Sequence, residues 1–365
     1  MITRTSPACQ TEIDDFNRVP AGAEPDADSD DWRKLLSEST LPVEQLLAQL
    51  DIPAQALDGS AVASIDGRID TAPLSFSVRA PAPFIQRMEK GNINDPLLRQ
   101  VLPVLAEQQP MPGYSDDPLQ EAQANVAPGL IHKYTSRALL IVSKACAINC
   151  RYCFRRNFPY QDNQPSRAQW RDALNYLREH AAINEIIFSG GDPLACSDRH
   201  LRWLGQQLAA IPHIRRLRIH SRLPVVLPQR VDTQLLQWLE SWPGQKVMVI
   251  HSNHTNEIDQ QVAQAVTKLR TAGVTVLNQT VLLKGVNDSA AALTALSERL
   301  FDVGVMPYYL HMLDPVAGAA HFAIDDKKAR QIVGEAAALL PGFLLPKLVR
   351  ELPNKNAKTL IAPIQ

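Results

Sequence analysis

Three of the chain's five cysteines lie within eight positions, in the stretch KACAINCRYCFRR at residues 144–156. Cys146, Cys150 and Cys153 have the spacing C-x3-C-x2-C. A structural zinc site normally has four ligands, and no cysteine or paired histidine follows at finger-like spacing. Three thiolates suit a [4Fe–4S] cluster better, because they leave one iron free to bind a reacting molecule. We therefore predict a catalytic iron–sulfur cluster, with a zinc site or a chance grouping of cysteines as the alternative.

A glycine-rich turn, SGGDP at Ser189–Pro193, directly follows the apolar run IIF. Glycines at the end of a strand let backbone groups approach a bound ligand closely. The turn comes one strand–helix unit after the cysteines, which indicates a functional role. His251 and His254 in HSNH are also close together, but two ligands alone do not make a metal site. Cys9 and Cys196 are interpreted as ordinary thiols.

Elements that would position these residues begin at residue 138, where short β-branched runs alternate with amphipathic stretches. Strands are expected at 137–146, 183–193, 214–222, 246–253, 274–283 and 305–313. Helices are expected between them, at 165–180, 198–211, 232–242, 256–273 and 289–304. About six such units fit a full or partial barrel, whose functional residues lie in the loops after the strands. A doubly wound open sheet has the same periodicity, so the pattern alone leaves both architectures open.

The N-terminal part of the chain has a different sequence pattern. Residues 1–130 lack the alternation and are rich in Asp, Pro and Ala, and we expect about the first 30 to be loosely held. Apolar residues at helical spacing predict a helix at 40–50 and a helix–turn–helix at 82–105. The N-terminal region is therefore predicted to be mainly helical.

The composition excludes several classes of function. Among 365 residues, 37 lysines and arginines face 38 aspartates and glutamates, a balance that attracts neither nucleic acid nor an anionic membrane. No run of about 18 apolar residues could cross a bilayer, and the N-terminus lacks the apolar core of a signal peptide. Five cysteines, three of them clustered, do not resemble a disulfide framework. We expect a cytoplasmic enzyme without a nucleic-acid or membrane partner.

The cysteine motif resembles the signature of radical S-adenosylmethionine enzymes, including the aromatic Tyr152 before the last cysteine. The resemblance implies that the free iron binds S-adenosylmethionine, and that one electron from an external donor then releases a 5′-deoxyadenosyl radical. This radical takes a hydrogen atom from the substrate. The family's glycine-rich motif contacts the methionine group, and it corresponds here to Ser189, Gly190, Gly191 and Asp192.

A narrower resemblance, to the lysine 2,3-aminomutase family, covers residues from about 94 to 358. The matching segments are NDPLLRQVLP, VAPGLIHKYTSRALL, CRYCFRR, SGGDPL, SRLPVVLPQR, NQTVLLKGVND, MPYYLHMLDPVAGAAHF and LPKLVRELP. The family requires pyridoxal phosphate, held as a Schiff base on a lysine. The corresponding residue is Lys358, seven positions after Glu351. Because NKNA replaces the family's glycine-rich stretch before this lysine, Lys355 stays the alternative.

The same resemblance implies how a free amino acid is recognised. Arg155 corresponds to the arginine that pairs with the substrate α-carboxylate, for which its planar fork is suited. Asp314 and Glu351 correspond to two acidic positions that hold the distant ammonium of lysine. Lys133 stands where aminomutases often have arginine, which leaves its phosphate contact open. The residues expected around pyridoxal phosphate are Tyr134, Arg137, Arg222 and Gln279.

As a whole, the resemblance implies an α/β fold in which a partial (β/α)6-type TIM barrel occupies residues 131–325. A mainly helical region at 1–130 precedes it, and an extension at 326–365 carries Lys358. The short C-terminus is similar to bacterial members that convert (S)-α-lysine to (R)-β-lysine, which a separate ligase attaches to elongation factor P. The alternatives are a free-lysine aminomutase of amino-acid metabolism and a radical RNA- or protein-modifying enzyme without pyridoxal phosphate.

Overall fold

The fold is known from a computed structural model that describes residues 27–53, 64–65, 68–69, 77–159, 165–353 and 355–364. The loosely held segment predicted from the sequence falls mostly in residues 1–26, outside the described residues, as does Cys9. No helix of the described ranges is long and apolar enough to cross a membrane.

A ten-stranded sheet forms the centre of the molecule, and its strands are ordered as they occur in the chain, from β3 to β12. Six adjacent parallel strands are β5 (Arg137–Ser143), β6 (Glu185–Gly190), β7 (Arg216–Ser221), β8 (Gln245–His251), β9 (Val274–Val281) and β10 (Met306–His311). β11 (Lys347–Arg350) continues the parallel order. Antiparallel strands β3 (Asn125–Ala127), β4 (Leu130–Tyr134) and β12 (Thr359–Leu360) lie at the two edges.

This strand order decides between the two architectures that periodicity left open. A doubly wound sheet reverses its strand order at a switch point, whereas consecutive units of a barrel follow one another around the sheet. The expected partial barrel is confirmed, together with the six predicted strands. The sheet edges do not pair with each other among the described residues, but side chains connect them: the Tyr134 hydroxyl donates to Glu351 Oε1 at 3.3 Å.

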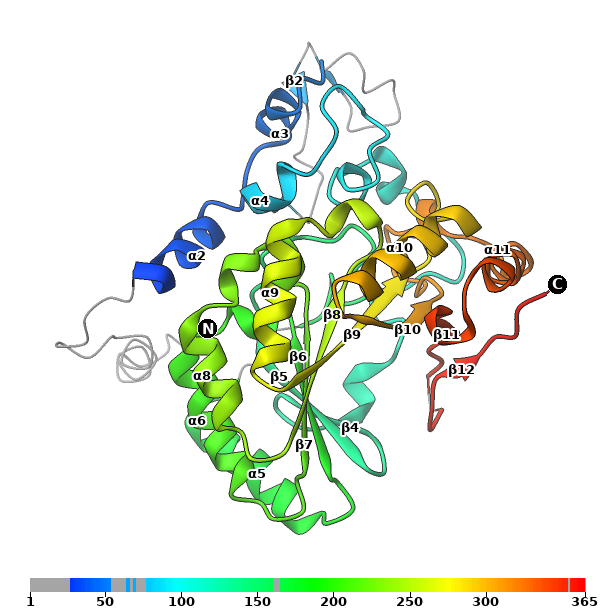
Figure 1. Ribbon diagram of the computed structural model, residues 1–365. Helices are drawn as coiled ribbons and strands as arrows, with labels where there is room; N and C mark the ends of the chain where they lie inside the picture. The colour runs from blue at the N-terminus through cyan, green and yellow to red at the C-terminus, as the bar shows by residue number, and fades with distance from the viewer. Residues whose placement is uncertain are drawn as a thin grey trace, which may run out of the picture.

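The predicted helices between the strands are also confirmed. They are α5 (Arg167–Glu179), α6 (Asp198–Ala209), α8 (Thr233–Ser241), α9 (Gln260–Thr271) and α10 (Ala290–Asp302). The structure also has α11 (Asp326–Leu339) and, after β7, the single turn α7 (Leu223–Val226), neither of which is among the helices predicted between the strands. Six of these helices start at a side-chain N-cap that accepts a backbone N–H from the first turn: Ser166, Ser197, Asp232, Asp259, Ser289 and, for α11, Asp325. In Figure 1, α5, α6, α8 and α9 lie together along one side of the strands.

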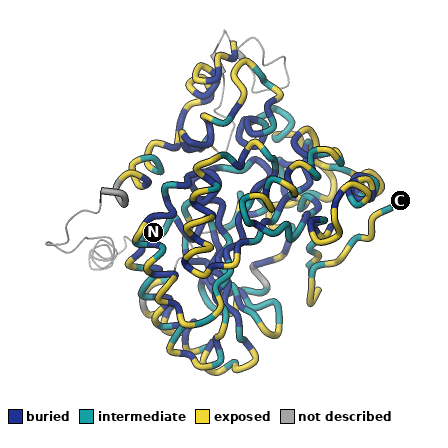
Figure 2. The backbone as a smooth tube through the Cα atoms, in the orientation of Figure 1, coloured by how far each residue is buried: buried dark blue, intermediate teal, exposed yellow. Residues whose placement is uncertain are grey.

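The two faces of the sheet differ in chemistry. The face beneath the helices is apolar and buried, with Leu140, Phe188, Ile219, Met248, Val276 and Leu310 on the successive strands β5 to β10. Side chains alternate between faces along a strand, so the neighbouring positions face the barrel interior. These interior positions include Ser189, His220, His251, Gln279 and His311. Figure 2 shows the central strands as mostly buried, while exposed segments lie on the outer sides of the helices and at the C-terminus.

The N-terminal region contains α2 (Ala27–Ser37), α3 (Val43–Gln49) and α4 (Ala82–Ile85), with a short hairpin of β1 (Ser64–Ile65) and β2 (Arg68–Ile69). The helix at 40–50 is confirmed, but the helix–turn–helix at 82–105 is wrong. Only α4 and a 3-10 turn at Leu98–Gln100 form there. Pro96 and Pro103 lack the N–H that a helix interior needs, and Gly91 adopts a positive φ of 73°.

Candidate active site

The three cysteines of the 144–156 segment lie in the loop after β5, at the end of the sheet where barrel enzymes bind their ligands. All three are half-buried and none forms a disulfide. Burial and the neighbouring thiols raise the pKa of Cys153 to about 11, and the same causes raise the pKa of Cys146 well above its usual value. Thiolates in such a place require a positive partner, which an iron cluster would supply.

Among the residues that the structure describes, no three His, Cys, Asp or Glu side chains are grouped to hold a single metal ion. In an iron–sulfur cluster each thiolate binds a different iron atom, so the three thiols need not converge on one ion. Cys196 does not join them, since its thiol donates to the Val142 carbonyl at 2.9 Å. The three cysteines therefore fit a cluster with one iron left open.

Arg222 lies beside the cysteine loop. Its Nη1 donates to Cys150 Sγ and to the Tyr152 hydroxyl, both at 2.7 Å. Its Nη2 donates to Gln100 Oε1 at 2.6 Å and to Glu257 Oε2 at 3.0 Å. The resemblance implied a contact with pyridoxal phosphate, but these partners place Arg222 at the cysteines.

The SGGD turn packs against the same loop. A Cβ on Gly190 would lie 2.4 Å from the Ser143 carbonyl oxygen, and one on Gly191 would lie 2.5 Å from that of Ala145. The Gly191 and Asp192 backbone N–H groups donate to these two carbonyls, each at 2.8 Å. Here the glycines allow close approach between two backbones, and this approach fixes the segment that leads into Cys146.

Asp192 is buried, and four protein groups occupy its carboxylate. Oδ1 accepts from the Leu194 N–H at 3.0 Å and from the Ser221 hydroxyl at 2.7 Å. Oδ2 accepts from the N–H groups of Arg222 at 2.8 Å and Leu223 at 3.1 Å. The described contacts therefore give Asp192 a role in holding the loop after β7, in addition to any contact with a bound ligand.

Arg155 is buried next to the SGGD turn and forms a bidentate pair with a residue that the sequence analysis missed. Its Nε and Nη2 donate to the two carboxylate oxygens of Glu121, at 2.7 and 2.8 Å. Its Nη1 donates to Ser189 Oγ at 2.8 Å and to the Gly190 carbonyl at 3.3 Å. Burial opposes ionisation of Glu121, but Arg155 outweighs it and lowers the pKa of that carboxyl.

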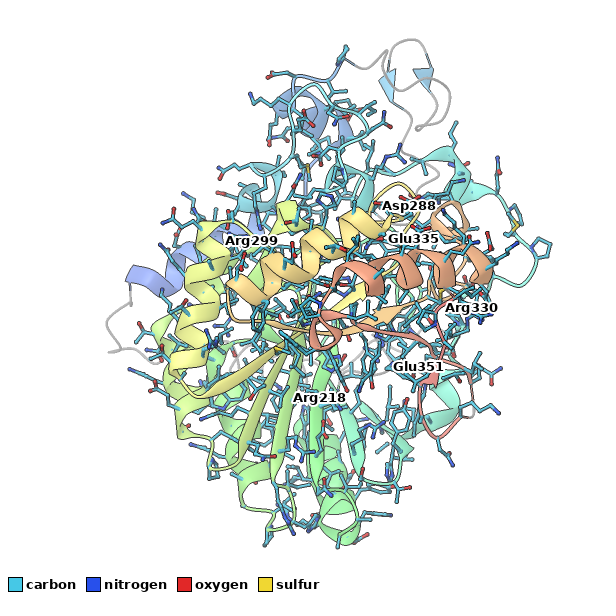
Figure 3. The ribbon with its side chains drawn as sticks, turned by 45° about the vertical axis from the view of Figure 1, so that its right-hand side comes forward. Arg218, Asp288, Arg299, Arg330, Glu335 and Glu351 are labelled. Carbon is cyan, nitrogen blue, oxygen red and sulfur yellow. The ribbon has the colours of Figure 1, made fainter. Side chains whose placement is uncertain are left out.

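Lys358 lies at the other side of the interior, where the chain enters β12. Its Nζ donates to Glu351 Oε2 and lies 5.9 Å from the centroid of the Tyr309 ring. The other oxygen of Glu351 accepts from Tyr134 and lies 3.9 Å from the Lys133 ammonium. Figure 3 shows Glu351 in the C-terminal segment. Lys355, by contrast, is exposed, so the structure favours Lys358 as the lysine that faces the interior.

The charges around Lys358 influence one another. Burial, together with the nearby Glu351 carboxylate, raises the pKa of Asp314 to about 7 against the opposing effect of Lys358. Burial also disfavours the charge of Glu351, but Lys358 outweighs it and the pKa of Glu351 is lowered. One carboxylate is therefore ionised, and the other is balanced between its two forms near neutral pH. An added ammonium group would ionise the second.

Two histidines on the interior face have buried Nε2 atoms without a hydrogen-bond partner among the described residues: His220 on β7 and His311 on β10. Burial and the Lys358 charge lower the pKa of His311 to about 3, so its ring is neutral. Orphaned polar atoms of this kind indicate a missing polar partner. Together with Lys358, they fit a polar aromatic cofactor such as pyridoxal phosphate.

The remaining expected cofactor residues lie on the same interior. Gln279 pairs in register with His251 on β8 and with Tyr309 on β10. The Arg137 guanidinium lies 3.9 Å from the centroid of the Tyr134 ring. Five residues of the site were not predicted from the sequence: Glu121, Gln100, Glu257, His220 and His311. The histidines could have been found from strand alternation, but Glu121, Gln100 and Glu257 reach the site only through the fold.

Comparison with known proteins adds two findings. A family described as the radical SAM superfamily matches residues 140–295. The L-lysine 2,3-aminomutase of Escherichia coli (strain K12) is 51% identical over 330 residues, which cover 90% of this chain and 94% of that protein. The enzyme of the same name from Haemophilus influenzae is 47% identical and covers 91% and 95%. The one from Clostridium subterminale is 32% identical over 93% of this chain but only 79% of its own length.

Proposed function

Because the chain belongs to the lysine 2,3-aminomutase family of radical SAM enzymes, we propose that it converts (S)-α-lysine to (R)-β-lysine with a [4Fe–4S] cluster, S-adenosylmethionine and pyridoxal phosphate. It is an isomerase that is similar over 90% and 91% of its length to the Escherichia coli and Haemophilus influenzae enzymes. An external one-electron donor would reduce the cluster before the reaction begins, and the isomerisation itself has no net gain or loss of electrons. Cys146, Cys150 and Cys153 hold the cluster in this proposal, and Lys358 holds pyridoxal phosphate.

The observation that carries the proposal is the position of Arg155 between the two halves of the interior. On one side it donates to Ser189 and Gly190, in the turn packed on the cysteine loop. On the other side its partner Glu121 lies within the electrostatic range of Glu351. A substrate carboxylate bound at Arg155 would therefore lie between the cluster and the lysine-facing acids. This is where a radical formed at the cluster must reach the substrate.

Each described residue then has a defined task. Arg155 binds the α-carboxylate, while Asp314 and Glu351 surround the ammonium at the far end of lysine. Ser189, Gly190, Gly191 and Asp192 form the turn that faces S-adenosylmethionine. When bound, the cluster with S-adenosylmethionine supplies a carbon radical that removes hydrogen, and pyridoxal phosphate supplies a conjugated system that accepts an unpaired electron. The protein holds both ends of lysine and so fixes which hydrogen is removed.

The test is an anaerobic incubation of iron-reconstituted protein with (S)-lysine, S-adenosylmethionine, pyridoxal phosphate and a strong reductant, followed by chiral separation of the amino acids. We expect (R)-β-lysine, and none from Cys150→Ala protein. Deoxyadenosine without β-lysine would retain the radical chemistry and reject lysine as the substrate. A protein that is purified colourless with bound zinc, and that takes up no iron on reconstitution, would reject both.

We further propose that the β-lysine serves the modification of elongation factor P, through a separate ligase in the cytoplasm. The match covers 94% and 95% of the Escherichia coli and Haemophilus influenzae enzymes but 79% of the Clostridium subterminale enzyme. This difference supports the assignment to the short form. In cells that lack this chain, elongation factor P is expected to lose the mass of one β-lysyl group and to regain it when β-lysine is supplied. An unchanged mass in those cells would reject this destination and leave the aminomutase activity untouched.

A further inference from the structure

Arg222 has a buried guanidinium that donates a hydrogen bond to one of the three cysteines, Cys150. It is 6% exposed, and Nη1 lies 2.7 Å from Cys150 Sγ. The neighbouring donor, Nη2, is directed to Gln100 and Glu257. An arginine cannot lose its proton in a protein, so it brings a permanent positive charge and a hydrogen-bond donor to one sulfur.

The position of Arg222 is fixed by the fold on two sides. On the backbone side, Asp192 accepts the N–H groups of Arg222 and Leu223 and the Ser221 hydroxyl, which locks the turn after β7. On the side-chain side, Glu257 is completely buried and pairs with Nη2 at 3.0 Å. Two elements that are distant in sequence therefore aim Nη1 at the sulfur.

A second set of bonds holds these partners in place. The Glu257 carboxylate accepts from Gln100 Nε2 at 3.1 Å and from the Asn253 backbone N–H at 2.9 Å. Asn253 Nδ2 donates to Gln100 Oε1 at 2.9 Å and to the Tyr152 hydroxyl at 2.6 Å. Arg222 Nε has no hydrogen-bond partner among the described residues, but Nη1 and Nη2 are both bonded to this buried network. These bonds leave the guanidinium little freedom to turn away from Cys150.

We propose that Arg222 is a positioning residue that sets the reduction potential of the cluster by donating a hydrogen bond to the Cys150 thiolate. The inference rests on the proposed function, because it takes Cys150 as a ligand of the cluster. Hydrogen bonds and charge around the sulfurs tune the potential of iron–sulfur clusters. Uptake of one electron adds one negative charge to the cluster, and a fixed cation beside it favours that state. Arg222 thus makes the cluster easier for the external one-electron donor to reduce.

The experiment is a potentiometric titration of the reconstituted cluster, followed by electron paramagnetic resonance, without S-adenosylmethionine. Arg222→Gln is expected to shift the potential to more negative values, and Arg222→Lys is expected to shift it less because the charge is retained. Glu257→Gln removes the opposing negative charge and is expected to shift the potential in the positive direction. The opposite signs of these shifts would not follow from general damage to the protein.

The matched control is Arg230→Gln. Arg230 belongs to the same segment and is completely buried, but it pairs with Asp198 and Asp232 and donates to the Leu194 carbonyl. Its replacement is expected to lower stability and leave the potential unchanged. An unchanged potential in both Arg222 variants would overturn the inference. This holds even if the variants bind S-adenosylmethionine more weakly, because the potential would then not depend on Arg222.

The inference and the proposed function fail in different ways. A wild-type protein that assembles the cluster and makes β-lysine, but whose potential does not depend on Arg222, rejects the inference alone. A wild-type protein without a cluster rejects the proposed function. Failure of both Arg222 variants to assemble a cluster, with the fold intact by circular dichroism, would also overturn the inference, because Arg222 would then be needed for assembly.

Discussion

The guanidinium of Arg155 pairs with both carboxylate oxygens of Glu121, from Nε at 2.7 Å and from Nη2 at 2.8 Å. Such a bidentate contact fixes the plane of the fork. Glu121→Gln is therefore expected to let Arg155 turn away from the substrate carboxylate. The KM for lysine should rise about tenfold, equivalent to about 1.4 kcal/mol, with a smaller change in kcat.

Glu107→Gln is the control for this variant, because Glu107 pairs with Arg151 and Arg156 in the same motif and does not bond to Arg155. It should reduce stability without changing the KM for lysine. The measurement is the KM for lysine of the two variants, determined by steady-state kinetics under the same conditions. An equal rise in KM for both would mean that Glu121 acts through general packing.

The contact between Lys358 and Glu351 leads to a prediction about cofactor attachment. After borohydride reduction, mass spectrometry of peptides is expected to find the pyridoxyl group on Lys358, which is 24% exposed and faces Glu351. Lys358→Ala should lose both the covalent cofactor and the formation of β-lysine. Lys355→Ala should retain both, since Lys355 is exposed. A pyridoxyl group on Lys355 would contradict this assignment.

Because the pKa of Asp314 is raised, we expect substrate binding to depend on pH. Its pKa of about 7 means that the carboxyl is mostly neutral at pH 6 and ionised at pH 8. A bound ammonium favours the ionised form, so lysine should bind more weakly as the pH falls below 7, by up to about tenfold per pH unit. Asp314→Asn should bind more weakly at pH 8 and lose this slope. Equal slopes in both proteins, measured from KM between pH 6 and 8, would exclude Asp314 as the titrating group.

The Asp314 carboxyl also makes the stability of the fold depend on pH. Substrate binding should weaken as the pH falls, whereas stability should decrease as the pH rises. The folded pKa of this carboxyl lies above the ordinary value of 3.8, so its contribution to the free energy of unfolding is present at low pH. That contribution is lost as the pH rises through about 7. Urea unfolding of wild-type and Asp314→Asn protein should show the wild type losing stability relative to the variant between pH 5 and 8. A constant difference would contradict the raised pKa.

Gly191 links the SGGD turn to the cysteine loop. In Gly191→Ala the new Cβ would lie 2.5 Å from the Ala145 carbonyl oxygen, next to Cys146, so the loop must move. We expect a loss of roughly 1–3 kcal/mol in stability, as is typical of overpacking, and a lower iron content after reconstitution. Gly342→Ala is the matched control, because nothing lies within 4 Å of its Cβ. Full iron content in Gly191→Ala protein would show that the close approach is dispensable.

Much of the fold could be predicted from the sequence because strand and helix periods are local properties of the chain. The boundaries of α6 and β8, for example, follow from alternation and from caps within a few residues. Local patterns failed at 82–105, where prolines and a positive-φ glycine stopped helices that apolar spacing favoured. They also did not show Glu121, because its partner Arg155 lies in a different segment. Arg222 was noticed, but its neighbour Cys150 could be identified only once β7 was placed beside β6.

The most direct test of the account is the fate of the α-nitrogen of lysine. Reconstituted protein would be supplied anaerobically with a mixture of unlabelled (S)-lysine and lysine carrying ¹³C at every carbon and ¹⁵N at the α-amino group. If the nitrogen migrates within one molecule, ¹³C-labelled β-lysine will retain ¹⁵N on its β-carbon, and unlabelled product will contain none. Nitrogen that moves between labelled and unlabelled molecules, or ¹³C-labelled product without ¹⁵N, would contradict an intramolecular migration held between Arg155 and the pair of Asp314 and Glu351.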